Sequence, residues 1–184
     1  MALDRYVTAG GWDAKAAGPL RTLAGLRVGI VGLGRIGSAV ATRLLALGAE
    51  VWANDLVLVA REGVRLVELD ELLAECDAVT LHVPLTRETR GLIGRRQIES
   101  MCPGVLLVNT SRGAVVDVGA LLVALRAGRL GGAALDVLPQ EPPPAPPIAP
   151  NLILTPHAAY YSAAAEERAF RLCLARVRDV LGTT

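Results

Sequence analysis

The sequence predicts an α/β fold, doubly wound around a mostly parallel sheet. Hydrophobic residues make up 52% of the 184 residues but aromatic residues only 3%, so the core must consist of Val, Leu, Ile and Ala. Such an aliphatic core is typical of parallel sheets that helices cover on both faces. From Arg27 onward, short apolar runs alternate with helical segments, which is the pattern of successive strand–helix–strand units.

The first half of the pattern begins with "RVGIV" at 27–31, a short apolar strand bounded by glycine. The helix expected at 36–48 ends at Gly48, because glycine is a common helix terminator. Further strands are expected at 50–55 and 64–68, followed by a short helix at 68–77.

The second half repeats the alternation. Pro84 closes a strand, and Gly128 ends a helix. Strands are expected at 78–84, 104–111, 131–137 and 151–156, and helices at 95–101, 118–128 and 162–181. The proline-rich segment 139–150 is too rigid for a helix or a central strand, so we expect a loop there.

Residues 1–24 are expected to form a separate arm. "LDRYVTAGGWD" has the pattern of a helix end that is stopped by Gly10 and Gly11, and a loop through Gly18 and Pro19 follows.

Charge and cysteine content exclude several classes of function. A net charge of +1 with scattered arginines does not favour binding to nucleic acid or to a membrane surface. Cys76, Cys102 and Cys173 lie far apart without metal-ligand spacing, so we expect no metal site and reduced, mostly buried thiols in a cytoplasmic protein. The N-terminus lacks the apolar region of a signal peptide, and no uncharged apolar run approaches the length of a membrane span.

The strongest motif is "GLGRIG", in which Gly32, Gly34 and Gly37 follow a strand and open a helix. Gly32 allows the tight turn, Gly34 allows the backbone to approach a pyrophosphate, and Gly37 allows the helix to pack on the strand. The helix N-terminus offers N–H donors to the phosphates. The alternative is a glycine-rich turn of some other α/β protein.

Asp55 ends the next strand, where a carboxylate accepts hydrogen bonds from the adenosine ribose and repels a 2′-phosphate. The sequence therefore favours NAD over NADP. Arg61 complicates this choice if its loop folds back, and a solvated strand-end acid is the other reading of Asp55.

Three more candidates follow the ends of later strands: Arg112 in "NTSRG", Glu141 in "LDVLPQEP" and His157 in "LTPHAAYYS". Ligands of doubly wound sheets bind outside the carboxyl ends of the strands, so one crevice could hold all three side chains. Together they offer a carboxylate clamp, a proton donor and an acid that orients and charges that donor, which suits the reduction of a 2-oxo acid. Taken singly, each has a simpler interpretation: Arg112 and Glu141 as surface charges, and His157 as a packed histidine at a strand end.

Five stretches together resemble the cofactor domain of the D-isomer-specific 2-hydroxyacid dehydrogenases: "TLAGLRVGIVGLGRIG", "LHVPLTRETRGLI", "LLVNTSRGAVVD", "GGAALDVLPQEP" and "LILTPHAA". The resemblance runs from Gly11 to the final helix, and "PHAAYYS" is most similar to the C-terminal-binding-protein-like branch. It implies a Rossmann-type NAD-binding domain at 25–184, preceded at 1–24 by the remnant of an inter-domain or dimer helix.

The resemblance also implies roles for single residues. Arg112 would bind the substrate carboxylate and carbonyl, His157 would donate the proton, and Glu141 would pair with His157. Arg35 and Ile36 would contact the pyrophosphate. The further cofactor contacts would be Gly32, Gly34, Gly37, Asp55, Val83, Pro84, Thr89, Thr110, Ser111, Asp136, His157 and Ala158, with Asp136 at the nicotinamide carboxamide.

Family members carry a second domain for the substrate, which these 184 residues lack, so we expect an active-site crevice that is open on one side. Two hypotheses follow. The first is the NAD-binding domain of an oxidoreductase that interconverts 2-oxo acids and D-2-hydroxy acids, and the second is a non-catalytic, NAD(H)-sensing regulatory module. The apolar composition and the arm also predict a homodimer.

Overall fold

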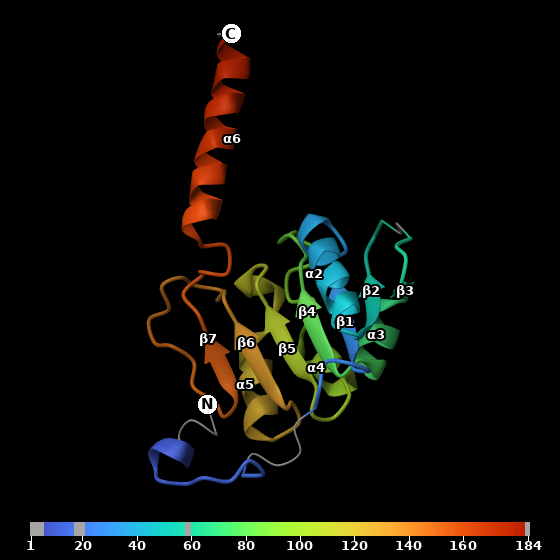
Figure 1. Cartoon of the computed structure of the whole chain (residues 1–184). Helices are drawn as coiled ribbons and strands as arrows, with labels where there is room; N and C mark the ends of the chain where they lie inside the picture. The colour runs from blue at the N-terminus through green and yellow to red at the C-terminus, as the bar shows by residue number, and fades with distance from the viewer. Residues whose placement is uncertain (1–5, 17–20, 58–59, 183–184) are drawn as a thin grey trace.

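The computed structural model describes residues 6–16, 21–57 and 60–182, and its centre is one parallel sheet (Figure 1). The strands, in the sheet order β3-β2-β1-β4-β5-β6-β7, are β3 (Val64–Leu66), β2 (Glu50–Asn54), β1 (Arg27–Val31), β4 (Ala78–Leu81), β5 (Leu106–Asn109), β6 (Gly132–Leu135) and β7 (Leu152–Leu154). The helices are α2 (Arg35–Ala46), α3 (Leu69–Glu75), α4 (Arg95–Ser100), α5 (Val118–Arg126) and α6 (Ala163–Leu181), with a 3₁₀ turn η1 (Gly113–Val115).

The order and direction of the strands indicate where a ligand crevice is expected. The chain enters at β1, winds outward through β2 to β3, then returns to β4 on the other side of β1 and winds outward to β7. All pairings are parallel, so all strands of the sheet present their carboxyl ends at the edge from which α6 departs (Figure 1). A ligand crevice is expected where the winding direction changes, between β1 and β4.

Every strand and helix expected from Arg27 onward is present, and the sheet is wholly rather than mostly parallel. The strands are shorter than the apolar runs suggested. The run 78–84 is a strand only to Leu81, and the run 104–111 only between Leu106 and Asn109. The residues after each strand turn away from the ladder, and their polar groups line the edge of the sheet.

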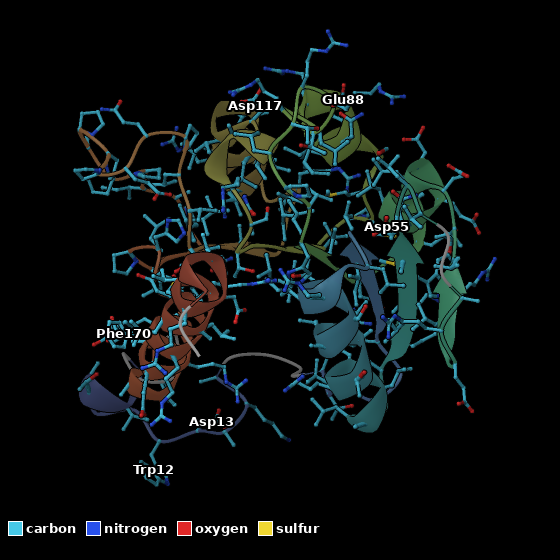
Figure 2. All side chains as sticks on the ribbon, turned by 90° about the horizontal axis from the view of Figure 1, so that it is seen from above. Trp12, Asp13, Asp55, Glu88, Asp117 and Phe170 are labelled. Carbon is cyan, nitrogen blue, oxygen red and sulfur yellow. The ribbon has the colours of Figure 1, made fainter. Side chains whose placement is uncertain are left out.

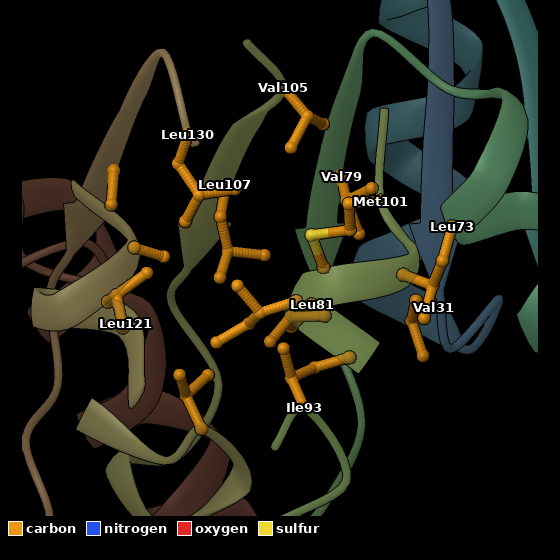
Figure 3. Packing of buried hydrophobic residues seen from close by; sticks show 14 of the residues in the cluster. Val31, Leu73, Val79, Leu81, Ile93, Met101, Val105, Leu107, Leu121 and Leu130 are labelled. Atoms are coloured by element: carbon orange, nitrogen blue, oxygen red, sulfur yellow. The ribbon is translucent and has the colours of Figure 1, made fainter. Parts of the chain in front are cut away.

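The main core is aliphatic, as predicted, and lies between the sheet and α3, α4 and α5 (Figure 3). Leu81, Leu107 and Leu121 are fully buried in it, and Trp52, Cys76 and Met101 are its exceptions to the aliphatic composition. A smaller cluster under α2 contains Ile30 and Val51. Helices therefore cover both faces of the sheet at β1 and β2.

The prediction of helices on both faces is wrong for β5–β7. There one face remains open within the described part of the chain, because α6 extends away from the sheet (Figure 1). Leu106 and Ile153 are exposed on this face. Together with Leu107, Ala134 and Leu152 they line a hollow of about 550 Å³.

The described part of the arm contains the end of a helix at 6–8 and the left-handed Gly10 (φ +89°), as predicted, whereas Gly18 and Pro19 lie outside the described residues. Cys76 is buried, but Cys102 is only partly buried and Cys173 is exposed, so the expectation of mostly buried thiols was wrong. Among the described residues, no helix is both long and apolar enough to span a membrane.

Candidate cofactor site and active site

The glycine-rich turn joins β1 to α2, and two of its glycines are required by packing. Gly32 has φ +94°, and a Cβ there would lie 2.8 Å from the carbonyl carbon of His82. A Cβ on Gly37 would lie 2.0 Å from the carbonyl oxygen of Gly32. These contacts leave no room for a side chain between the turn, the first turn of α2 and the segment after β4.

Gly34 is different, because a Cβ there would meet no protein atom within 4 Å. Gly34 is the N-cap of α2, and no side chain caps the N–H groups of the first turn. Arg35 and Ile36 follow, and both are exposed. Open space, free N–H donors and the positive end of the helix dipole together fit a pyrophosphate.

Asp55 lies at the tip of β2, beside α2 (Figure 2). One carboxylate oxygen accepts a hydrogen bond from the Leu33 N–H at 2.5 Å, and the other accepts one from the Val57 N–H at 2.9 Å. The carboxylate therefore supports the glycine-rich turn itself. It remains partly exposed and retains lone pairs that can accept hydrogen bonds from a ribose.

The loop after β4 contains Val83, Pro84 and Thr89. The Thr89 hydroxyl donates to the Pro84 carbonyl at 2.6 Å and accepts from the Thr86 N–H at 2.7 Å. This hydroxyl therefore closes the loop. Before this loop, His82 contacts the Thr80 hydroxyl at 3.1 Å, and burial lowers the pKa of the imidazole.

The segment after β5 presents Arg112. Asn109, at 0% exposure, accepts hydrogen bonds from the N–H and the hydroxyl of Ser111, and it donates to the Arg112 carbonyl. Thr110 is partly buried between them. The Arg112 guanidinium is exposed and donates to the Ser111 carbonyl at 2.6 Å. Among the described residues, no acidic side chain forms an ion pair with Arg112.

Asp136 follows β6 and is buried, at 6% exposure. Its carboxylate accepts hydrogen bonds from the Thr155 hydroxyl at 2.5 Å and from the N–H groups of Ala158 and Ala159 at 2.8 and 3.0 Å. Burial alone would raise the pKa of Asp136, but the hydrogen bonds from Thr155, Ala159 and Ala158 outweigh it, so the pKa lies below its ordinary value.

His157 follows β7 in a left-handed conformation (φ +53°), which costs a residue with a side chain free energy unless contacts hold it. Its N–H donates to the Asp136 carbonyl at 2.8 Å. Asp136 therefore holds the turn on both sides of the histidine. The side chain of His157 is 43% exposed, so it is not a packed core histidine.

The imidazole Nδ1 of His157 lies 2.7 Å from Glu141 Oε2, and Glu141 Oε1 accepts the Leu138 N–H at 2.8 Å. The hydrogen bond with His157, followed by that from Leu138, lowers the pKa of Glu141, so this residue is an ionised acceptor near neutral pH. Nδ1 then carries the proton, and Nε2 makes no hydrogen bond to any described residue. The proline-rich loop thus brings Glu141 to His157.

The strand ends are also connected to each other. The Asp136 N–H donates to the Asn109 carbonyl at 3.0 Å, and the His157 N–H donates to Asp136. The segments that carry Arg112, Asp136 and His157 are therefore neighbours at one edge of the sheet. Sequence reasoning missed Asn109 and Thr155, although both are polar residues that end or directly follow an apolar strand.

Comparisons with known proteins show the family to which the chain belongs. The family model described as D-isomer specific 2-hydroxyacid dehydrogenase, NAD binding domain, matches residues 1–159. D-3-phosphoglycerate dehydrogenase of Archaeoglobus fulgidus is 46% identical over 164 residues, which is 85% of this chain and 31% of that protein. Glyoxylate reductase of Korarchaeum cryptofilum is 47% identical over 169 residues, which is 85% of this chain and 50% of that protein. The chain thus spans half or less of the length of these two relatives.

Solved structures give the same result. The structure of D-lactate dehydrogenase from Aquifex aeolicus, complexed with NAD and lactic acid, matches with a TM-score of 0.89 and 34% identity over 98% of this chain and 60% of that chain. The NAD complex of a D-isomer specific 2-hydroxyacid dehydrogenase from Lactobacillus delbrueckii matches with a TM-score of 0.88 and 30% identity over 100% and 62%. Sheet order, glycine-rich turn and family match all agree: the chain belongs to the D-isomer specific 2-hydroxyacid dehydrogenases, and it is their NAD-binding domain.

Proposed function

We propose that this chain is the cofactor half of an NAD-dependent dehydrogenase that interconverts a 2-oxo acid and a D-2-hydroxy acid. The observation that carries the proposal is the His157–Glu141 pair at 2.7 Å, on the same sheet edge as the guanidinium of Arg112, which forms no ion pair with any described acidic residue. Arg112 follows β5 and His157 follows β7, with Asp136 after the strand between them.

Each residue of this set has a separate task. The planar guanidinium of Arg112 binds the carboxylate of the 2-oxo acid through paired hydrogen bonds. His157 donates the proton from Nε2 to the carbonyl oxygen, while Glu141 keeps the opposite nitrogen protonated and stabilises the imidazolium. When bound, NADH supplies the hydride that the carbonyl carbon accepts.

The proposed cofactor contacts follow the same edge. Gly32, Gly34 and Gly37 shape the pyrophosphate cradle, in which Arg35 and Ile36 present backbone N–H groups. Asp55 accepts hydrogen bonds from the adenosine ribose and thereby favours NAD. The segments after β4, β5, β6 and β7 line the nicotinamide half through Val83, Pro84, Thr89, Thr110, Ser111, Asp136, His157 and Ala158. Asp136 has three of its acceptor sites in use, and one further acceptor site remains for the carboxamide.

The test is oxidation of NADH by the purified chain, followed by absorbance, against glyoxylate, pyruvate, hydroxypyruvate and a bulky aryl 2-oxo acid. We expect His157→Ala to abolish turnover and to leave NADH affinity unchanged, because His157 acts on the substrate. A large loss of NADH binding in this variant would contradict the role as proton donor. Binding of NADH without any turnover would instead identify a cofactor domain that depends on a substrate domain.

We further propose that residues 25–184 form the cofactor domain, that 1–24 is an arm, and that "PHAAYYS" places the chain near the C-terminal-binding-protein-like branch. The regulatory alternative has no support in the comparisons, since the relatives described above are enzymes.

The free thiols of Cys76, Cys102 and Cys173 favour the cytoplasm as the compartment. Reaction of all three thiols with a disulfide reagent after unfolding, without prior reduction, is the expected check.

We also propose that the chain forms a homodimer through its arm. Exposed apolar side chains support this proposal, above all Trp12 at 89% exposure.

A further inference from the structure

Asn109 is a completely buried polar residue that the proposed chemistry does not use. It ends β5, three residues before Arg112. A buried side-chain amide is costly unless its donors and acceptors are satisfied, so the partners of Asn109 indicate why it is there.

The partners of the Asn109 side chain are Ser111 and the backbone carbonyl of Arg112. Asn109 Oδ1 accepts from the Ser111 N–H at 2.9 Å and from the Ser111 hydroxyl at 2.7 Å. Asn109 Nδ2 donates to the Arg112 carbonyl at 3.0 Å. The Arg112 guanidinium in turn donates to the Ser111 carbonyl at 2.6 Å. One amide side chain therefore holds the backbone on both sides of Arg112 Cα, at the Ser111 N–H before it and at the Arg112 carbonyl after it.

The turn has little freedom to shift as a unit. A Cβ on Gly113, directly after Arg112, would lie 1.9 Å from the carbonyl carbon of Leu138. On the other side, the Asn109 carbonyl accepts the Asp136 N–H. The turn is thus held against the segment after β6, and Asn109 restrains the backbone between the Ser111 N–H and the Arg112 carbonyl.

The guanidinium carries five N–H donors, of which one is used on the Ser111 carbonyl. The other donors make no hydrogen bond to the described part of the chain and can bind a ligand, provided that the backbone carrying them is fixed. A misplacement of about 1 Å in such a group can cost about a hundredfold in rate.

We propose that Asn109 is a positioning residue for the substrate carboxylate: by fixing the Ser111 and Arg112 peptides it presents the Arg112 guanidinium in one orientation. This inference rests on the proposed function, in which Arg112 binds that carboxylate.

The test uses the full chain loaded with NADH, and oxamate, the amide analogue of a 2-oxo acid, as the probe. In Asn109→Asp the acceptor for Ser111 is retained, but the donor to the Arg112 carbonyl is replaced by a second oxygen. The matched control is Asn54→Asp at the end of β2, where Asn54 Nδ2 likewise donates to a backbone carbonyl, that of Val67, at 3.0 Å. The two variants make the same chemical change at two strand ends.

We expect Asn109→Asp to weaken oxamate binding about tenfold, because a displaced Arg112 guanidinium would lose one charge-assisted hydrogen bond to the oxamate carboxylate. NADH affinity and the circular dichroism spectrum should be unchanged, and Asn54→Asp should bind oxamate like the unaltered chain. Unchanged oxamate affinity in Asn109→Asp would overturn the proposal, and so would an equal loss in both variants.

Arg112→Ala tests the carboxylate role of Arg112 separately from the positioning role of Asn109. If this variant binds oxamate as well as the unaltered chain does, the carboxylate role of Arg112 fails, and amide hydrogen exchange then decides the role of Asn109. Faster exchange of the Ser111 amide, whose N–H donates to Asn109 Oδ1, in Asn109→Ala would support the positioning role. Exchange as slow as in the unaltered chain would refute it.

Discussion

Gly34 and Gly37 lie one helical turn apart in the same motif, yet the space around them predicts opposite effects of the same substitution. Gly34 has φ −67° and open space where a Cβ would be, so Gly34→Ala should leave stability unchanged or raise it by about 0.5 kcal/mol. The added methyl group fills the cradle, so NADH should bind about tenfold more weakly or worse. Thermal unfolding and NADH fluorescence titration measure the two effects.

Gly37→Ala should destabilise the protein, in contrast to Gly34→Ala. Its methyl group would overlap the Gly32 carbonyl oxygen, so we expect a loss of about 3 kcal/mol in the free energy of unfolding. If Gly34→Ala proved the more destabilising of the two, the assignment of open space to Gly34 and of packing to Gly37 would be refuted.

Asp136 makes a prediction about pH. Because its pKa is lowered in the folded chain, its contribution to stability is complete above its unfolded pKa of about 3.9 and is lost as pH falls through the lower folded value. Asp136→Asn should therefore cost about 2 kcal/mol at neutral pH, and the difference should shrink below about pH 4. Urea unfolding of both proteins at neutral and acid pH gives the comparison, and a difference that persisted in acid would contradict the role of the ionised carboxylate.

At the residue scale, the sequence was informative about position more than about partners. Arg112, Glu141 and His157 could be selected because each follows an apolar strand, and parallel strands end at one edge. Their roles remain proposals. The occupied lone pairs of Asp136 and the loop-closing hydroxyl of Thr89 could not be predicted, because they depend on where neighbouring backbone groups point after the strand has ended.

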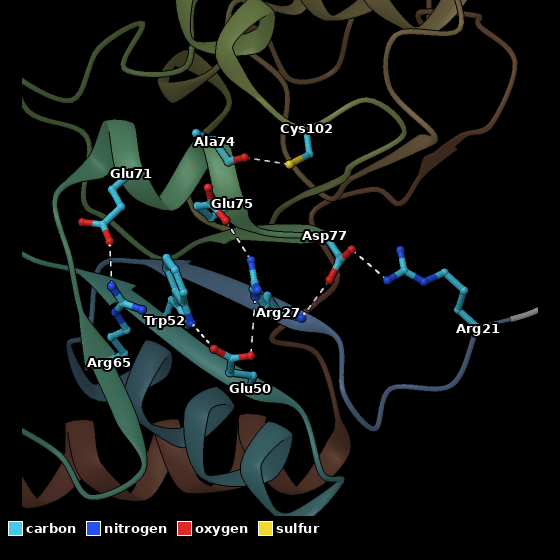
Figure 4. Close-up of polar contacts among 10 residues, drawn as sticks. All are labelled: Arg21, Arg27, Glu50, Trp52, Arg65, Glu71, Ala74, Glu75, Asp77 and Cys102. Atoms are coloured by element: carbon cyan, nitrogen blue, oxygen red, sulfur yellow. Dashed lines mark hydrogen bonds and ion pairs between the residues drawn. The ribbon is translucent and has the colours of Figure 1, made fainter.

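At the scale of elements, the amino ends of β1 and β2 carry a polar cluster around Trp52 (Figure 4). The guanidinium groups of Arg27 and Arg65 lie over its ring at 5.5 and 4.2 Å, and its Nε1 donates to Glu50 at 2.8 Å. Arg27 also pairs with Glu75 at 2.7 Å. The ion pairs of this cluster are substantially exposed, so the buried ring should contribute more to stability than the charges do.

This cluster predicts unequal costs of two truncations. Trp52→Ala should lower the free energy of unfolding by about 3–5 kcal/mol, because the ring is 4% exposed and its removal leaves a cavity. Arg65→Ala removes one exposed ion pair and one cation–π contact, which contribute about 1 kcal/mol or less. Denaturant unfolding measures both, and equal losses would mean that the charges hold the strands together.

The order and type of the elements could be predicted because the period of the apolar residues changes from strand to helix along the chain. The covering of the sheet could not. The stripe of apolar residues in 162–181 predicts a helix with a buried face, but periodicity does not say which surface buries it. In the structure α6 leaves the sheet, and Phe170 and Val177 stay exposed.

At the scale of the whole molecule, exposed apolar side chains that a partner could cover lie on the arm, with Trp12, on α6, with Phe170, and on the open face of β5–β7, with Leu106. Figure 2 shows Trp12 pointing away from the sheet, and an indole with 89% exposure is unusual for a monomer. We therefore expect a dimer by light scattering at micromolar concentration. Trp12→Asp should shift it toward monomer, because a carboxylate at the interface would be buried without a partner. Phe170→Asp makes the matching change on α6 and should leave the dimer intact. Dissociation by Phe170→Asp alone would move the interface to α6, and a monomeric unaltered chain would refute the dimer itself.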